Sequence, residues 1–188
     1  MKSEMQIRKR LGEQKFRLLY SDNDIERRVK SLADEINRDF QDSPSLTIIG
    51  VLKGSFIFIA DLVRNLTIPL HVEFITASSY LKTESTGSVT IKDDSLPDLR
   101  SKDVLIIEDI VDSGLTIQTL VNFIKTKEPS SIKVCSFLMK PHKVKEEISK
   151  IDYVGFELSD GFVVGYGLDY DQNYRELPHI IELLDVDM

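Results

Sequence analysis

The stretch 104–116 constrains the fold of this chain more than any other part of the sequence. It begins as an apolar run of β-branched and aliphatic residues, which is typical of a strand buried on both faces. The run ends abruptly at two carboxylates, Glu108 and Asp109, and a third acid follows at Asp112. After Gly114, apolar residues recur at helical spacing: Ile117, Leu120, Val121 and Ile124. The stretch therefore predicts a strand, an acidic edge, a tight turn and the start of a helix.

The turn in this stretch has the residues of an anion site. Backbone N–H groups and hydroxyls at a helix N-terminus hold phosphates, and this is the place of Ser113, Gly114 and Thr116. Carboxylates beside a phosphate make sense if the ligand also carries a diol and a metal ion. Glu108 and Asp109 would then accept hydrogen bonds from a ribose diol, with a hard cation bridging diol and phosphates. The alternative is an ordinary strand-to-helix turn with solvated acids.

Composition limits the class of partner. The 188 residues suffice for one domain with a sizeable core, and we expect a single domain over 1–188. Hydrophobic residues at 41% and charged residues at 29% are typical of a globular protein. The net charge of −7 argues against binding to nucleic acid or to an anionic membrane, because no positive field recruits phosphates. A polyanionic substrate would then need local cations or magnesium.

The cysteine content and the apolar runs predict a cytoplasmic protein. Cys135 is the single cysteine, which excludes an intrachain disulfide and suits a reducing compartment. It lies in the apolar run 134–138, so we expect a buried structural thiol. No apolar stretch reaches transmembrane length, and the N-terminal residues lack the apolar core of a signal peptide.

The first half of the chain predicts a second unit of strand, glycine turn and helix. Ser21 is a favourable N-cap for an amphipathic helix that runs to Phe40. An apolar strand, 46–52, then leads into the turn 53–55, Lys-Gly-Ser, and a helix restarts at Phe56. This turn is a second candidate anion site, although Lys-Gly-Ser is also a common structural turn.

Further strands are expected at 68–75, 132–139, 153–158 and 162–168, with a closing edge strand at 180–184. The polar stretch 78–95 is too long and too polar for a tidy hairpin and is either disordered or a lid. Strands that alternate with helices predict an α/β fold with a mainly parallel sheet covered on both faces. Ligands in such sheets bind at the carboxyl ends of the strands, which is where Lys53, Asp109 and Lys140 fall.

The stretch 104–116 resembles the phosphoribosyl-pyrophosphate motif of the type I phosphoribosyltransferases, and the likeness extends from 18–40 to His179. The resemblance implies that Glu108 and Asp109 hold the ribose hydroxyls. It also implies that the 5′-phosphate is wrapped by Asp112, Ser113, Gly114, Leu115 and Thr116. The implied fold is a mainly parallel sheet flanked by helices, with a mobile catalytic loop and a small hood.

Two other segments resemble loops of the same family. The segment 52–55 is similar to its pyrophosphate loop, and Ser79-Tyr80 is similar to its mobile catalytic loop. The residues that these loops would bring to the substrate are Lys53, Gly54, Ser79 and Tyr80. This chain also departs from the pattern at two places. Many relatives have a second glycine where Ser55 stands and a lysine where Leu115 stands, which leaves the phosphate affinity open.

The C-terminal third is similar to the hypoxanthine-guanine branch of that family, in the run 162–170 with Arg175 behind it and in 154–157 upstream. The chemistry of individual residues agrees with this resemblance. Lys140 can donate a hydrogen bond to the carbonyl of a 6-oxopurine, whereas the amino group of adenine would leave two buried donors unpaired. Phe162, beside Val163, can stack on the purine face. From the sequence alone, Lys140 could equally be an exposed lysine and Phe162 plain core.

The implied reaction is purine salvage, in which phosphoribosyl pyrophosphate and hypoxanthine or guanine give IMP or GMP and pyrophosphate. Departure of pyrophosphate leaves oxocarbenium character on the ribose, so the site must stabilise separated charge. Magnesium, Arg175 and the Lys53 loop would hold the leaving group, and the metal-side carboxylates would be Glu108, Asp109 and Asp169. Asp112 is the candidate general base for the purine proton. Closure of the lid would exclude water.

Other interpretations stay open. A nucleic-acid-binding regulator could keep the site as an effector sensor, although the acidic balance and the single-domain length count against it. A sister enzyme could use xanthine, since the two-position substituent is read largely by backbone groups. The family suggests a homodimer or a homotetramer. The three histidines, His71, His142 and His179, show no metal spacing and are expected to be structural or surface residues.

Overall fold

The computed structural model describes residues 2–79, 89–92, 96–144 and 150–185, and its helices and strands alternate as the sequence predicts. The helices are α1 (Lys2–Leu11), α2 (Asp22–Asp39), α3 (Phe56–Val63) and α4 (Leu115–Lys125). The strands are β1 (Phe16–Tyr20), β2 (Leu46–Leu52), β3 (Leu70–Ser79), β4 (Val89–Lys92), β5 (Asp103–Val111), β6 (Ser131–Met139), β7 (Tyr153–Glu157), β8 (Phe162–Val164) and β9 (Ile180–Leu183).

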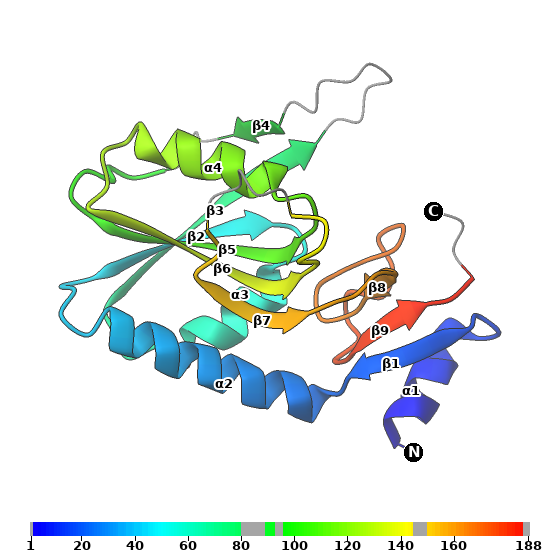
Figure 1. Cartoon of the computed structure of the whole chain (residues 1–188). Coiled ribbons are helices and arrows are strands. Elements are labelled where there is room, and N and C mark those ends of the chain that lie inside the picture. Colours follow the sequence, from blue (N-terminus) through cyan, green and yellow to red (C-terminus); the bar gives the residue numbers. More distant parts are fainter. Residues whose placement is uncertain (1, 80–88, 93–95, 145–149, 186–188) are drawn as a thin grey trace.

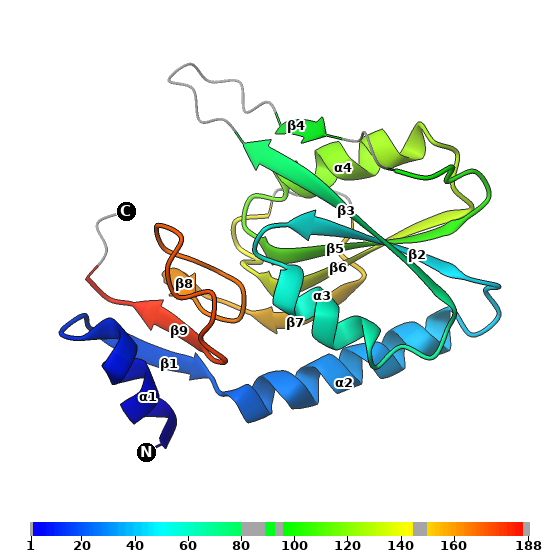
Figure 2. The ribbon, with the colours of Figure 1, turned by 180° about the vertical axis from the view of Figure 1, so that it is seen from behind.

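A central sheet of six strands has the order β4-β3-β2-β5-β6-β7 (Figure 1). Strands β3, β2, β5, β6 and β7 run parallel, and β4 at the edge is antiparallel to β3. Helix α4 covers one face of the sheet, and α2 and α3 cover the other, as the two opposite views show (Figures 1 and 2). The predicted mainly parallel sheet flanked by helices is therefore confirmed.

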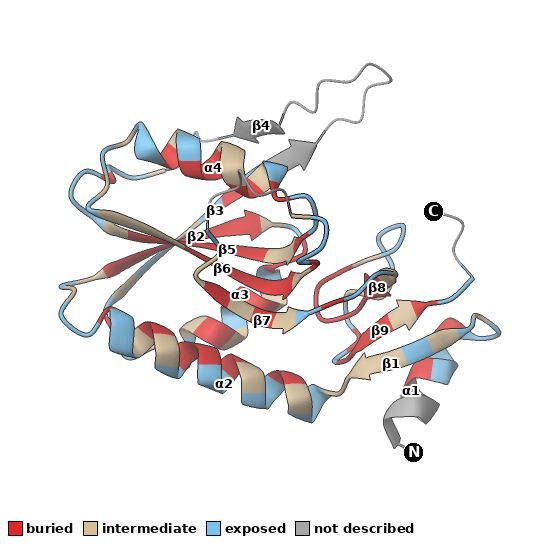
Figure 3. Ribbon diagram, viewed as in Figure 1, coloured by how far each residue is buried: buried red, intermediate tan, exposed pale blue. Residues whose placement is uncertain are grey.

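Both faces of the central sheet carry an apolar layer, which explains why its inner strands are apolar along most of their length (Figure 3). Under α2 and α3 the layer is centred on Leu32, Ile36 and Phe58. Under α4 it is centred on Leu120 and Ile124. The Cys135 thiol is buried in the first layer, as predicted, and its burial raises its pKa.

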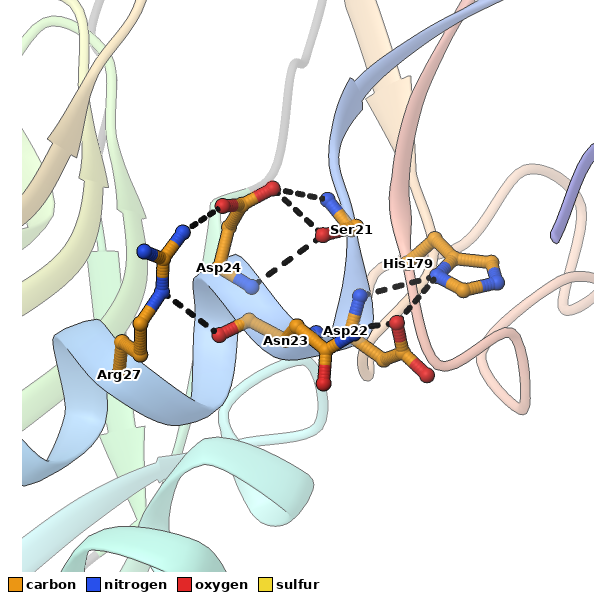
Figure 4. A network of polar contacts seen from close by, with 6 residues as sticks. All are labelled: Ser21, Asp22, Asn23, Asp24, Arg27 and His179. Carbon is orange, nitrogen blue, oxygen red and sulfur yellow. Dashed lines mark hydrogen bonds and ion pairs between the residues drawn. The ribbon is translucent and has the colours of Figure 1, made fainter.

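The N-terminus of α2 is closed by a capping box (Figure 4). The N–H of Asp24 donates to Ser21 Oγ at 3.2 Å, and the N–H of Ser21 donates to Asp24 Oδ2 at 3.1 Å. The imidazole of His179, 1% exposed, accepts a hydrogen bond from the N–H of Asp22 at Nδ1, at 3.0 Å. The helix donors are thus satisfied by side chains near and far in sequence. The predicted cap at Ser21 and the structural role of His179 are confirmed.

A second, antiparallel sheet of order β1-β9-β8 lies beside the carboxyl ends of the central strands (Figure 1). Together with α1, which packs on it through Ile7 and Leu11, this sheet forms the predicted small hood. The prediction of an edge strand at 180–184 is wrong, because β1 pairs with one side of β9 and β8 with the other. Val163 and Tyr166 of the hood segment belong to the apolar layer under α2, so hood and central sheet share one core.

Two other predictions need correction. Strand β5 does not end at the acids but continues through Glu108 and Asp109 to Val111, because its parallel pairing with β6 continues that far. The stretch 78–95 was not expected to form a hairpin, yet β4 pairs antiparallel with β3, with Ser79 opposite Val89. Tyr80 and the rest of the predicted lid, 81–88 and 93–95, lie outside the described residues. In the described part of the chain, no helix combines the length and the apolar character that a membrane crossing requires.

Candidate active site

The carboxyl ends of β2, β3 and β5 meet the hood loop 165–175 around a cleft of about 370 Å³. The cleft is lined by Val51, Leu52, Lys53, Gly54, Thr76, Glu108, Asp109, Thr116, Asp169, Gln172 and Arg175. Seven of the predicted site residues are among them: Lys53, Gly54, Glu108, Asp109, Thr116, Asp169 and Arg175. Segments far apart in the sequence therefore converge on one cleft, as expected for the strand ends of a parallel sheet.

Glu108 and Asp109 form the acidic wall of this cleft. The side chain of Glu108 is 8% exposed, and its buried Oε2 has no hydrogen-bond partner among the described residues. Burial, followed by the charge of Asp109, raises the pKa of Glu108 well above its usual range. Asp109 is oriented by its own strand, since Oδ1 accepts a hydrogen bond from the N–H of Ile110 at 2.8 Å. The site thus holds a buried acceptor that a ligand hydroxyl can satisfy.

The turn after β2 packs tightly against both the acids and the hood. A Cβ atom on Gly54 would overlap the carboxylate of Asp109, and a Cβ atom on Gly167 would overlap the carbonyl oxygen of Gly54. The Leu52–Lys53 peptide bond in this turn is cis. Ser55, with φ of −78°, is buried and its hydroxyl donates to the carbonyl of Val51. Serine therefore fits this position, because its backbone needs no left-handed conformation.

Arg175 organises the hood loop on the opposite side of the cleft. Its guanidinium donates to the carbonyl of Gly167 at 2.7 Å and pairs with Asp169 Oδ1 at 2.8 Å. The other oxygen of Asp169 accepts a hydrogen bond from the N–H of Gln172 at 2.8 Å. Asp169 and Arg175, predicted as metal-side carboxylate and leaving-group cation, are therefore direct partners of each other.

The turn 112–116 joins β5 to α4. Gly114 has a φ of +79°, which glycine adopts without a steric penalty. The N–H groups of the first helical turn have no acceptor within the helix and can bind an anion. Thr116 faces the cleft, whereas the Leu115 side chain is exposed. The groups of this turn that can bind an anion are therefore its backbone N–H groups and hydroxyls, and the Leu115 side chain is not among them.

Lys140 follows β6 and is buried, 6% exposed, so the alternative of an exposed lysine is wrong. Its Nζ donates to the carbonyl of Gly161 at 3.0 Å and lies 3.7 Å from Asp112 Oδ2. Phe162 is half-buried, with its ring 5.4 Å from that of Tyr170 in an edge-on arrangement. Val163 is buried in the core, so its side chain does not line the surface, and only its backbone could contact a ligand.

Sequence reasoning missed several residues of the site. Thr76 and Gln172 line the cleft, and Lys143 and Asp160 lie beside Asp112 and Lys140. Thr76 pairs with Leu52, the last residue of β2, three residues before β3 ends at Ser79, so the rule that ligands bind at strand ends could have indicated it. Lys143 and Asp160 are joined only by tertiary contacts, for which the sequence carries no signal.

The donor set of the cleft suits a hard cation only in part. Glu108, Asp109 and Asp169 supply carboxylate oxygens to the same cleft, which is the chemistry that Mg²⁺ prefers. Among the described residues, however, no group of three or more His, Cys, Asp or Glu side chains is arranged to hold a metal ion alone. The carboxylates therefore fit a cation that takes most of its ligands from substrate oxygens and water.

Comparisons with known proteins agree with this geometry. A family model described as the phosphoribosyl transferase domain matches residues 19–171. The chain is 45% identical over 165 residues to the hypoxanthine-guanine phosphoribosyltransferase of Bacillus subtilis, covering 87% of this chain and 91% of the relative.

Solved structures show the same fold. A hypoxanthine-guanine phosphoribosyltransferase from Bacillus anthracis, with HEPES in its active site, matches with a TM-score of 0.85 at 40% identity and covers 92% of this chain and 100% of that one. A hypoxanthine phosphoribosyl transferase from Trypanosoma cruzi, studied for the role of its C-terminal region in oligomeric state and activity, matches with a TM-score of 0.84 at 37% identity. It covers 92% of this chain and 93% of the other.

Proposed function

Because this chain belongs to the phosphoribosyl transferase family, we propose that it is a 6-oxopurine phosphoribosyltransferase of purine salvage. It transfers the 5-phosphoribosyl group of phosphoribosyl pyrophosphate to hypoxanthine, guanine or both, and gives IMP or GMP and pyrophosphate. In terms of reaction class it is a glycosyltransferase of the pentosyltransferase type. The names of its relatives support the base class, and the residues of the cleft support the chemistry.

The observation that carries the proposal is the buried Oε2 of Glu108, which has no hydrogen-bond partner among the described residues. It lies next to Asp109 in a cleft that Lys53 and Arg175 also line. A buried acceptor without a donor costs free energy, and a ribose diol supplies two donors at the right place. Around it, Thr116 and the first N–H groups of α4 suit the 5′-phosphate. Lys53 and Arg175 suit the pyrophosphate leaving group.

We propose magnesium as the cofactor on the same donor set. When bound with the pyrophosphate, the ion neutralises the phosphate charge and stabilises the leaving group. Glu108, Asp109 and Asp169 would hold it together with substrate oxygens and water. Arg175, the ion-pair partner of Asp169, would lie beside this ion and could add its charge to the phosphate site.

Asp112 and Lys140 would act on the purine. Lys140 is pre-positioned by burial and by the Gly161 carbonyl to donate to the six-position oxygen. Asp112, close to it, takes the proton of the ring nitrogen that attacks the ribose, as a general base. Phe162 would stack on the base, and Val163, whose side chain is buried, would contact it through the backbone. Substrate contacts of Ser113, Gly114 and Leu115 are proposed through the backbone of the turn.

The remaining proposals concern closure, assembly and location. Ser79 and Tyr80 would belong to a loop that closes over the bound substrates and excludes water.

We propose a single-domain enzyme that forms a homodimer or homotetramer. The exposed apolar side chains of Phe56, Val72 and Phe74 on α3 and β3 support association. A cytoplasmic location is supported by the free thiol of Cys135. Nucleic acid and membranes are not expected as partners at a net charge of −7.

The test is a panel of bases assayed with phosphoribosyl pyrophosphate and magnesium. Hypoxanthine or guanine should give the nucleoside monophosphate and pyrophosphate. Adenine should react at least ~10²-fold more slowly, because the ammonium group of Lys140 would face the amino group of adenine and neither could accept a hydrogen bond. Excess chelator should abolish turnover, and added magnesium should restore it. Adenine used as well as guanine would overturn the base assignment, and full activity in chelator would remove magnesium from the proposal.

A further inference from the structure

The carboxylate of Asp112 lies between two ammonium groups. Its Oδ2 is 3.7 Å from the Nζ of Lys140, and its Oδ1 is 3.7 Å from the Nζ of Lys143. Both lysines belong to the short turn after β6, which is closed by a 3.0 Å hydrogen bond from the N–H of Lys143 to the carbonyl of Lys140. The proposed reaction uses Asp112 and Lys140, and so far it gives Lys143 no part.

Lys143 also has a second carboxylate partner. Its Nζ lies 3.4 Å from Asp160 Oδ1, and the same oxygen lies 3.1 Å from the Nε2 of His142. The next residue, Gly161, accepts the hydrogen bond from Lys140. These contacts join the turn 140–143 to the turn that leads into β8, so one polar cluster supports both the general base and the segment that carries the purine-stacking ring.

We propose that Lys143 is a positioning residue that orients Asp112 as the general base, and that Asp160 holds Lys143 in place. The proposal rests on the function proposed above. Asp112 is half exposed, at 50% of its side chain, so burial alone does not fix its carboxylate. Cations that contact both oxygens restrict that carboxylate to one orientation beside the base pocket. Correct orientation is a large part of what a catalytic group contributes to rate.

Charge balance explains why a second acid is needed. When Asp112 takes the purine proton, its negative charge is lost and two ammonium groups remain beside it. Lys140 keeps the Gly161 carbonyl and the purine oxygen as acceptors, and Lys143 keeps Asp160 as its counter-ion. The proton transfer therefore leaves neither cation without a partner.

The contribution of these ion pairs to folding should be small, because Lys143 and its partners are partly exposed and pairs of this kind add little stability. Removal of Lys143 is therefore expected to change turnover rather than fold. This separates a positioning role from a merely structural one. The matched control is Lys150, an exposed lysine whose Nζ lies 3.7 Å from Asp152 and which is not part of the cluster.

The experiment is a mutant cycle on kcat, with KM measured for each substrate and the melting temperature measured for each variant. Lys143→Ala should lower kcat about tenfold, below the ~10²-fold that a full ångström of misplacement can cost. The KM for phosphoribosyl pyrophosphate and the melting temperature should stay near wild type. Lys143→Arg should restore most of the loss, and Asp160→Asn should show a smaller loss in the same direction. Lys150→Ala should behave as wild type.

The decisive comparison adds Lys143→Ala to Asp112→Asn. If Lys143 acts through Asp112, the double variant should be no slower than Asp112→Asn alone. An independent further loss in the double variant would overturn the proposal, as would a wild-type kcat in Lys143→Ala or an effect confined to KM for the base. A wild type that makes no IMP or GMP would instead overturn the proposed function, so the two failures are distinguishable.

Discussion

Gly54 lies so close to Asp109 that a side chain at position 54 would take the place of the carboxylate. The glycine is thus required by a close approach between two segments rather than by an unusual turn. It allows the turn 53–55 to lie directly against Glu108 and Asp109, so that Lys53 and these carboxylates line one cleft. The absence of a side chain at position 54 therefore brings this turn and the acidic wall together.

We predict that Gly54→Ala displaces the Asp109 carboxylate and raises the KM for phosphoribosyl pyrophosphate. Loss of one charge-assisted hydrogen bond to the diol is worth about 1.5–3 kcal/mol, or roughly ten- to a hundredfold. The KM for the purine should change little, since Lys140 and Phe162 are not part of this contact. The measurement is steady-state kinetics with each substrate varied in turn.

The control for this variant is Gly12→Ala, at a position where an added Cβ meets nothing within 4 Å. It should leave both KM values unchanged. An unaltered KM for phosphoribosyl pyrophosphate in Gly54→Ala would show that Asp109 does not hold the substrate where we place it.

At the scale of elements, α2 shows how local signals and distant contacts combine. Ser21, which the sequence predicts as the N-cap, forms a capping box with Asp24, and the distant His179 accepts a hydrogen bond from the N–H of Asp22 (Figure 4). The helix thus fixes the hood to the central sheet through its N-terminus, while its apolar stripe supplies one layer of the core.

We predict that Ser21→Ala lowers stability without altering catalysis. Loss of an N-cap side chain costs about 0.5–2 kcal/mol, which corresponds to a decrease of roughly 1–8 °C in melting temperature for a protein of this size. Ser31→Ala, at an exposed position within the same helix, is the control. Its hydroxyl contacts Arg28 at 3.0 Å and Glu35 at 3.4 Å on the helix surface, where such contacts add little stability, so this variant should melt close to wild type. Equal melting temperatures for Ser21→Ala and wild type would contradict a stabilising cap, and a changed kcat would contradict its separation from the site.

Most elements follow from the sequence because their signals are local: apolar runs give β2, β5 and β6, and helical spacing gives α2 and α4. The wrong predictions concern segments whose structure depends on pairing with a strand that is distant in the sequence. Strand β5 continues through Glu108 and Asp109 because β6 pairs with it. Strand β9 is a middle strand because β1 pairs with the edge that β8 leaves unpaired. The antiparallel pairing of β3 and β4 likewise depends on two partners rather than on either segment alone.

At the scale of the whole molecule, the site exists because the hood meets the strand ends. Gly167 of the hood lies against the Gly54 carbonyl, and Arg175 and Asp169 line the wall opposite Glu108 and Asp109. The strand-end rule made Lys53, Asp109 and Lys140 predictable. Lys143, Asp160 and Gln172 were not predictable in the same way, because their roles depend on loops brought together only by the packing of the hood.

The central claim is that Lys140, delivered by β6 to the ligand edge of the sheet, reads the six-position oxygen of a purine. The most direct measurement is kcat/KM for hypoxanthine, guanine and adenine, with direct phosphoribosyl-pyrophosphate binding, in wild type and Lys140→Ala. We predict a loss of roughly ten- to a hundredfold for both oxopurines, from a lost charged hydrogen bond of about 1.5–3 kcal/mol. Phosphoribosyl-pyrophosphate binding should change little, and adenine should be a poor substrate of both wild type and variant. A variant that uses hypoxanthine as wild type does, or a wild type that uses adenine as well as guanine, would contradict the claim.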